Sequence, residues 1–288
     1  MSICLTSGSP TLIAPRYINI LDNGPTNDNE INIHQLEDHQ VFLQGDFTGF
    51  HTYLIVTHTK FSITRDSLKK ISTNEFSAEI NYEIDDSEVI TKIVTFYTPL
   101  NLPFEYVNAR KFGREYNSFE FKFIGTKEPQ SFTCDLSFMI HCSKSSNFLI
   151  PLEIKYIGMA AKNGRTAQER LGKGHEKLQT VLAELNSKDQ FKSASLVLYK
   201  PGKLNSKDIT FEETVETLEA SLIQYFKPKP LNKEHLNFPN NKTKLTMKLK
   251  YFGINQVLTV IESPKKTRLS SKYLESEQCT HTFFVNIP

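Results

Sequence analysis

The chain has 288 residues and a mass of 33.0 kDa, and 39% of its residues are hydrophobic and 23% charged. This composition is typical of a globular protein, and the length suffices for one large domain or two of ordinary size. With only 12 Gly and 13 Pro, the chain is neither collagen-like nor of low complexity. No apolar run approaches the roughly 20 residues that a membrane-spanning helix needs.

Charge is distributed unevenly along the chain, although the formal net charge is only +2. Residues 1–100 contain 13 acidic and 6 basic side chains, so the positive excess lies in residues 101–288. A polyanion is therefore expected to meet the carboxyl-terminal two-thirds of the chain.

Residues 1–15 contain neither a basic segment nor a long apolar core, so an intracellular, cytoplasmic protein is expected. The cysteines form no CxxC pair. We therefore expect buried free thiols rather than a zinc site or a disulfide framework at Cys4, Cys134, Cys142 and Cys279.

The hydrophobic pattern predicts an α+β fold in three parts. Residues 1–130 are expected to form a β-rich recognition or interaction module. Alternating β-branched and aromatic residues predict its strands at Val41–Leu43, His51–Thr57, Glu79–Ile84, Val89–Tyr97 and Phe119–Ile124.

Residues 131–236 show a β-β-α-β-α order. Two segments, Phe132–Cys142 and Phe148–Ile157, are expected to pair as a hairpin. A helix should begin after Thr166, where Glu169 completes a capping box, and should bury Leu171, Leu178, Val181, Leu182 and Leu185.

A strand, Ala194–Tyr199, is expected to precede a second capped helix. Thr210 and Glu213 mark its start, and Pro228 and Pro230 end it. Its apolar face comprises Val215, Leu218, Leu222, Ile223 and Phe226.

Residues 237–288 are expected to form a basic β-tail that packs on one of the other two parts, because it is too short for its own core. The expected strands are Lys244–Phe252, Gln256–Ile261 and Thr280–Ile287. Two-residue alternation would place Lys244, Lys248 and Lys250 on one face, where they either follow a nucleic-acid backbone or form a solvated sheet edge.

Glu219 is the most informative single residue. At helical spacing it shares a face with Val215, Leu222, Ile223 and Phe226. A buried carboxylate must either take up a proton or face a cation. We therefore expect Glu219 to have a partner, either a basic side chain or a metal ion, unless it lies at the edge of the apolar face and reaches solvent.

Several segments, in order, resemble the GIY-YIG nuclease family. They are Tyr156-Ile157-Gly158, Arg170 and His175 on the next helix, Glu219 on the following helix, and Pro230-Leu231-Asn232. The resemblance covers roughly residues 132–236 and implies a nuclease domain with a β-β-α-β-α-α order.

The resemblance also implies a role for each matching residue. Glu219 would ligate one divalent ion, Mg²⁺ or Mn²⁺, which would polarise the scissile phosphate. Arg170 would hold the phosphate, and Tyr156 would position or deprotonate the attacking water. Gly158 would leave room for the nucleic-acid backbone, and Asn232 would brace Glu219.

Other positions near these motifs are less defined. His175 is either catalytic or a core histidine. The family's first tyrosine motif is absent from the expected first strand, where His141 would take its place as a general base or would be an ordinary strand residue. Lys162, Arg165 and Lys173 would grip phosphates beside the site.

The predicted function is metal-dependent hydrolysis of phosphodiester bonds, as a DNA endonuclease of a kind found in restriction or anti-phage defence. A catalytically inactive relative that binds nucleic acid or protein is one alternative. A second is a PD-(D/E)XK-type nuclease, because Asp135 with Glu153 and Lys155 on the expected hairpin resembles that family's D…ExK pattern. A structural interaction protein that binds no nucleic acid also stays open.

Overall fold

The computed structural model describes residues 1–13, 49–85, 88–112, 115–125, 131–144, 149–171, 175–188, 191–202, 209–228 and 230–288. It contains both helices and strands, with strands predominating, in agreement with the predicted class. The predicted strand Val41–Leu43 and the candidate Lys173 lie outside the described residues. Within the described part, no helix has the length and apolar character needed to cross a bilayer.

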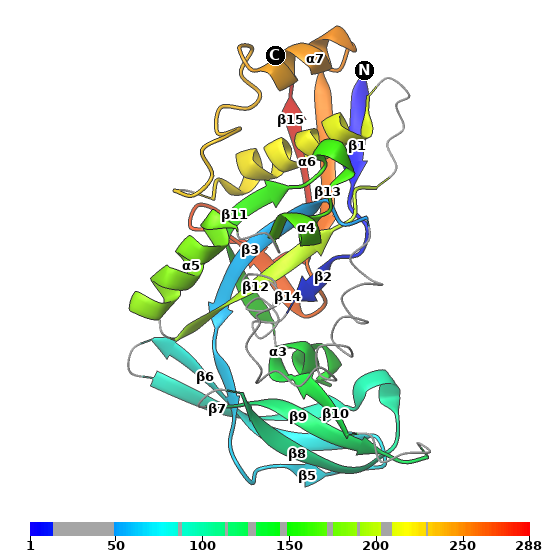
Figure 1. Ribbon diagram of the computed structural model, residues 1–288, viewed down its shortest axis with the longest axis vertical. Coiled ribbons are helices and arrows are strands. Elements are labelled where there is room, and N and C mark those ends of the chain that lie inside the picture. The colour runs from blue at the N-terminus through cyan, green and yellow to red at the C-terminus, as the bar shows by residue number, and fades with distance from the viewer. Residues whose placement is uncertain are drawn as a thin grey trace.

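A five-stranded sheet forms the middle of the molecule (Figure 1). The central strand β3 has antiparallel neighbours on both sides, β11 and β12, and β14 is parallel to β11. Side chains of β3 alternate between two hydrophobic clusters, with Tyr53 and Ile55 on one face and Leu54 and Val56 on the other. In spatial order the strands are β14 (Thr267–Ser270), β11 (Ile150–Met159), β3 (Thr52–Thr59), β12 (Lys192–Tyr199) and β2 (Thr11–Ile13).

Two short helices, α4 (Ala167–Leu171) and α5 (Glu176–Ser187), cover the Tyr53 face of this sheet. The predicted capping box is present at the start of α4. Thr166 Oγ1 accepts the Glu169 N–H at 3.3 Å, and Glu169 accepts the Thr166 N–H at 2.7 Å. A single-turn 3₁₀ helix, η3 (Lys162–Gly164), connects β11 to α4.

The longest helix, α6 (Phe211–Phe226), packs on the opposite face of the central sheet. Thr210 and Glu213 form the predicted capping box, and Lys227 ends the helix in the left-handed conformation just before Pro228.

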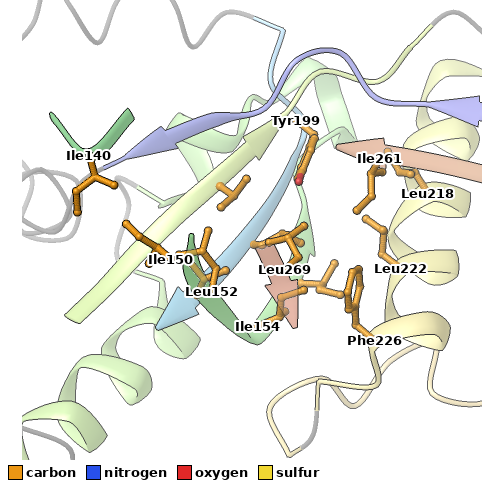
Figure 2. Close-up of a cluster of buried hydrophobic side chains, with 14 of the residues drawn as sticks. Ile140, Ile150, Leu152, Ile154, Tyr199, Leu218, Leu222, Phe226, Ile261 and Leu269 are labelled. Atoms are coloured by element: carbon orange, nitrogen blue, oxygen red, sulfur yellow. The ribbon is translucent and has the colours of Figure 1, made fainter. Parts of the chain in front are cut away.

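A second sheet of three strands covers the outer side of α6. Its order is β1 (Ser2–Thr6), β13 (Gln256–Glu262) and β15 (Thr280–Asn286), with β1 parallel to β13. Tyr225 stacks on Phe283 of β15, with ring centroids 4.0 Å apart. Figure 2 shows Leu218, Leu222 and Phe226 of α6 in the cluster shared by the two sheets. Because it lies between two sheets, α6 is buried over most of its surface, and Glu219 is only 7% exposed.

The segment between β3 and β11 folds into two antiparallel sheets of its own (Figure 1). Stacked and edge-to-face rings fill its core, among them Phe76, Phe96, Phe119 and Phe121. Its elements are β4 (Phe61–Ile63), β5 (Lys69–Lys70), β6 (Glu75–Asp85), β7 (Glu88–Tyr97), η1 (Pro99–Asn101), β8 (Phe104–Phe112), β9 (Glu115–Phe123) and β10 (Ser131–Asp135).

The predicted division at residue 130 does not coincide with a boundary between sheets. Strands β2 and β3 come from the part predicted as an amino-terminal module, yet they pair with β11 and β12 in the central sheet. The β-rich segment is thus inserted between two neighbouring strands of that sheet. The carboxyl-terminal residues were expected to pack on one of the other two parts, but they pair with strands of both, through β13 on β1 and β14 on β11.

The predicted hairpin Phe132–Cys142 with Phe148–Ile157 is wrong. Strand β10 ends at Asp135, whose carboxylate accepts the Ser137 N–H at 2.8 Å and caps the short helix α3 (Leu136–Met139). A 3₁₀ turn, η2 (Ile140–Cys142), follows. Strand β10 pairs with β9, and β11 pairs with β3 and β14.

The predicted strand Lys244–Phe252 is also wrong, because this segment forms helix α7 (Lys244–Tyr251). Alternating Leu245, Met247, Leu249 and Tyr251 fit a strand. However, only Leu245 and Leu249, one helical turn apart, are buried, and Thr243 caps the helix by accepting the Thr246 N–H at 3.2 Å. The three lysines therefore do not share one strand face.

All four cysteines are free, but the expected burial holds only in part. Cys134 is buried, Cys4 and Cys142 are half-buried, and Cys279 is exposed.

The segment after α6 is tied to the central sheet by the buried side chain of Asn232. Its Oδ1 accepts the Ile157 N–H at 2.9 Å, and its Nδ2 donates to the Ile157 carbonyl at 2.7 Å. This side chain thus satisfies both backbone groups of one residue of β11.

Replacing Asn232 with alanine should lower the free energy of unfolding by about 2–4 kcal/mol, because both backbone groups of Ile157 would be left buried without partners. Urea denaturation measures the change. Asn237→Ala, at an exposed position of the same segment, is the control and should stay within about 0.5 kcal/mol of the wild type. Equal losses in the two variants would contradict this account.

Candidate active site

Two tyrosines from neighbouring strands meet at one end of the β3–β11 pair. Tyr53 of β3 lies directly opposite Gly158 of β11, and Tyr156 lies two residues before that glycine. The ring centroids of Tyr53 and Tyr156 are 6.2 Å apart. A Cβ on residue 158 would lie 2.5 Å from the Tyr53 Cζ and Oη atoms, so glycine is required for the Tyr53 ring to cross the strand here.

His175 lies against both tyrosines. Its Nε2 is 2.7 Å from Tyr53 Oη, and its ring centroid is 5.4 Å from each phenol ring. His175 is also the N-cap of α5, where its Nδ1 accepts the Leu178 N–H at 3.3 Å. Burial, followed by the nearby Arg170 charge, lowers the His175 pKa to about 4, so the ring is neutral near pH 7.

These contacts determine the direction of the hydrogen bonds. Because Nδ1 of the neutral His175 accepts, the proton is on Nε2, which donates to Tyr53. Two hydrogen bonds therefore run in series from the Leu178 N–H of α5 through His175 to the Tyr53 hydroxyl. Arg170 and Tyr156 also interact electrostatically with Tyr53.

Glu219 lies on the other side of this pair. Its carboxylate lies near the backbone N–H of Met159, next to Gly158. Burial raises its pKa to about 8, and the negative charges of Glu234 and Glu216 add to the effect, while Arg170 opposes it. Burial, and then the Glu219 charge, also raises the Tyr156 pKa to about 12.

The structure thus brings together four predicted catalytic residues: Tyr156, Arg170, His175 and Glu219. The fifth, His141, lies in η2 and not on the strand that pairs with β11, so its predicted place as the first-motif residue is wrong.

The strand residue that faces β11 at this point is Tyr53 of β3, which was not among the predicted site residues. Tyr53 lies in the predicted strand His51–Thr57, but tyrosines are common in β-strands, so its residue type alone did not indicate a site. The pairing partner of β11 could not be found by looking for an adjacent hairpin, because the whole inserted segment separates β3 from β11.

The predicted nucleic-acid contacts are divided between two regions. Lys162 and Arg165 are exposed in the connection from β11 to α4, next to the candidate site. His51 holds this connection to β3, because its Nδ1 lies 2.6 Å from the Ala160 carbonyl and 3.0 Å from the Arg165 carbonyl. Asn232 braces Ile157 rather than Glu219, in contrast to the prediction.

On α7, two of the three predicted lysines are engaged with neighbouring groups. Lys248 pairs with Glu213 of α6 at 2.9 Å, and Lys250 donates to Asn241 at 2.6 Å. Lys244 is exposed at the start of the helix.

The D…ExK alternative loses its geometric basis. Asp135 ends β10 in another sheet, where it caps α3. Glu153 pairs with Lys155 at 2.6 Å and with Lys192 at 3.6 Å. A pocket of about 190 Å³ lies beside Glu153 and Lys155, and none of Tyr53, Tyr156, Arg170, His175 and Glu219 lines it.

The fit of a metal ion at Glu219 follows from the charges around it. The negative charges of Glu234 and Glu216 outweigh the effect of Arg170 at Glu219, so the local balance favours a further positive charge there. Among the described residues, no group of three or more His, Cys, Asp and Glu side chains could enclose an ion. One carboxylate suits an ion such as Mg²⁺, which usually keeps several waters and takes further oxygens from phosphate.

Comparisons with family models, with curated proteins and with solved structures found no match to this chain.

Gly158→Ala should displace both tyrosine rings, because the added Cβ would lie 2.5 Å from Tyr53 and 2.7 Å from Tyr156 Cε1. We expect a loss of about 1–3 kcal/mol in the free energy of unfolding and a changed near-ultraviolet circular dichroism spectrum. In the control Gly8→Ala, the nearest atom would be 3.5 Å away, so little change is expected. An unchanged tyrosine spectrum in Gly158→Ala would contradict the packing described here.

Glu219→Gln should stabilise the metal-free protein at alkaline pH. The folded chain holds the Glu219 proton up to about pH 8, whereas the ordinary pKa is 4.5, so stability falls as pH rises between these values. Glutamine does not titrate, so the stability of the variant does not fall with pH for this reason. In urea titrations with a chelator, its advantage over the wild type should grow from pH 5 to pH 8 to on the order of a few kcal/mol. A difference that does not change with pH would contradict a buried, protonated carboxyl.

Proposed function

We propose that the chain is a metal-dependent nuclease that hydrolyses phosphodiester bonds in DNA, with chemistry of the GIY-YIG type. The observation that carries the proposal is the meeting of Tyr53 and Tyr156 on antiparallel strands, with Arg170 and Glu219 close to them. The expected family pattern has a tyrosine on each of two paired strands. Tyr53 supplies the one that was missing from the sequence motif.

Each side chain has a task that its surroundings support. Arg170 is exposed and lies close enough to Tyr53 to affect its pKa, so it can hold a phosphate oxygen beside the tyrosines. Tyr156 stays neutral near pH 7, because its pKa is raised to about 12. It is therefore better suited to orient an attacking water by hydrogen bonding than to remove its proton as a phenolate.

His175 and Tyr53 act through Tyr156. The α5 cap fixes the His175 tautomer, and His175 donates to Tyr53, whose ring lies 6.2 Å from that of Tyr156. Tyr53 would in turn hold the Tyr156 ring in position for an incoming phosphate or water.

Glu219 would hold the divalent ion, which when bound supplies positive charge at the phosphate and the leaving oxygen. Burial raises the free energy of the ionised Glu219 carboxylate, so a bound cation would stabilise it more than it would stabilise an exposed carboxylate. Lys162 and Arg165 lie on the connection that leads to Arg170 and can contact neighbouring phosphates.

The test is cleavage of supercoiled plasmid in Mg²⁺ or Mn²⁺. We expect Glu219→Gln and Tyr53→Phe to lower the rate by about 10²-fold or more, since each removes a group at the reacting phosphate or its positioning partner. Glu153→Gln is the matched control, because this half-buried carboxylate lies on β11 but pairs with lysines outside the cluster.

The outcomes separate the functional alternatives. Loss of cleavage in Glu153→Gln with activity retained in Glu219→Gln would overturn the proposal. Salt-dependent binding of DNA without cleavage in any metal would favour an inactive nucleic-acid-binding protein instead. Cleavage of RNA but not of DNA with the same sequence would overturn the choice of substrate.

A further inference from the structure

His235 faces the carboxylate of Glu219 from the segment that follows α6. Its Nε2 lies 3.7 Å from Glu219 Oε2, and the two side chains are only 14% and 10% exposed. This distance is longer than the 2.7–3.2 Å of an N–H···O hydrogen bond. The two groups are thus close neighbours without a direct hydrogen bond.

The backbone of His235 adopts a conformation that is unusual for this residue type. Its φ angle is +58°, in the left-handed region, which costs a non-glycine residue roughly 1–2 kcal/mol. Both sides of the residue are anchored. Asn232 binds the backbone of Ile157, and the buried Phe238 donates its N–H to the His235 carbonyl at 2.9 Å. The anchored turn aims the imidazole at the buried carboxylate.

The separation of the two groups fits a shared metal ion. Ligand atoms at about 2.0–2.2 Å from one ion lie about 2.8–3.8 Å apart for angles of 90–120°. The 3.7 Å between Nε2 and Oε2 falls in this range. A second carboxylate, Glu234, adjoins His235 and adds to the negative potential at Glu219.

We propose that His235 is a second protein ligand of the divalent ion at Glu219, and that this pair gives the site a preference for Mn²⁺ over Mg²⁺. The proposal rests on the metal site assigned to Glu219 under the proposed function. Imidazole nitrogen is a poor ligand for Mg²⁺, which takes oxygen, whereas transition-metal ions accept both donors.

Direct measurement of Mn²⁺ binding, with no nucleic acid present, tests the proposal. Electron paramagnetic resonance of free Mn²⁺ gives the dissociation constant, and pulsed experiments on bound Mn²⁺ detect coupling to an imidazole nitrogen. The variants are His235→Ala and His235→Gly. The glycine variant also removes the imidazole but suits the left-handed backbone, so it guards against misfolding. Asn237→Ala, exposed on the same segment, is the control.

We expect wild type and Asn237→Ala to bind Mn²⁺ equally and to show the nitrogen coupling. Both His235 variants should bind Mn²⁺ about 10–100-fold more weakly and lose the coupling. Their affinity for Mg²⁺, measured by competition, should stay within about threefold of the wild type. Glu219→Gln should lose both ions.

Each other outcome overturns a defined part of the proposal. If Glu219→Gln loses Mn²⁺ but the His235 variants keep both affinity and coupling, His235 is not a ligand and the Glu219 site remains. If Glu219→Gln binds Mn²⁺ like the wild type, both the ligand assignment and the metal site are wrong. If the nitrogen coupling depends on His235 but no nucleic acid is cleaved, the ligand assignment holds and the nuclease function fails.

Discussion

The burial of one carboxylate constrains the rest of the structure around it. Helix α6 lies between two sheets, so the Glu219 side chain is buried and cannot extend into solvent on either side of the helix. A buried ionised carboxylate is tolerated only with hydrogen bonds and positive charge nearby. Arg170 and the nearby Met159 N–H supply part of this, and the raised pKa indicates that the compensation is incomplete. The hydrophobic contacts of Leu218, Leu222 and Phe226 keep the helix in place despite this cost.

The position of the Tyr53–Tyr156 pair depends on the register of β3 against β11. Tyr53 faces Gly158 across the β3–β11 pair, and a bulge between Ile154 and Tyr156 sets which side chains of β11 point toward α4 and α5. A shift of one residue would move Tyr53 to the face that packs on α6. Asn232 holds Ile157, next to the glycine, and so fixes this register from the side of the α6 segment. The register and the helix position are therefore coupled through one short stretch of β11.

Local signals in the sequence predicted much of the helical framework of the candidate site, although the single helix expected after Thr166 is two helices, α4 and α5. The capping boxes at Thr166 and Thr210 and the apolar spacing around Glu219 depend on residues a few positions apart, and the structure has them as expected. The segment Lys244–Phe252 was predicted as a strand but forms helix α7, because its apolar residues fit both a two-residue and a four-residue period. The pairing of β3 with β11 was out of reach for a different reason. Strand partners are set by packing and not by nearness in sequence. The sequence predicts the nearest β-like segment, Phe132–Cys142, as the partner, although most of it forms α3 and η2.

The position of the inserted segment explains how the site can tolerate it. Strand β3 begins at the tyrosine end and runs toward the insertion, and β11 returns antiparallel from the insertion to Gly158. The insertion thus enters and leaves at the end of the strand pair opposite to Tyr53 and Gly158. With a rise of about 3.3 Å per residue, the several residues between Tyr53 and Thr59 separate the site from the insertion by roughly 20 Å. Because the entropy of closing a loop grows only slowly with its length, a large folded insertion adds little cost to the pairing of its two ends. Its sequence can change without moving the tyrosines, provided that β3 and β11 keep their register.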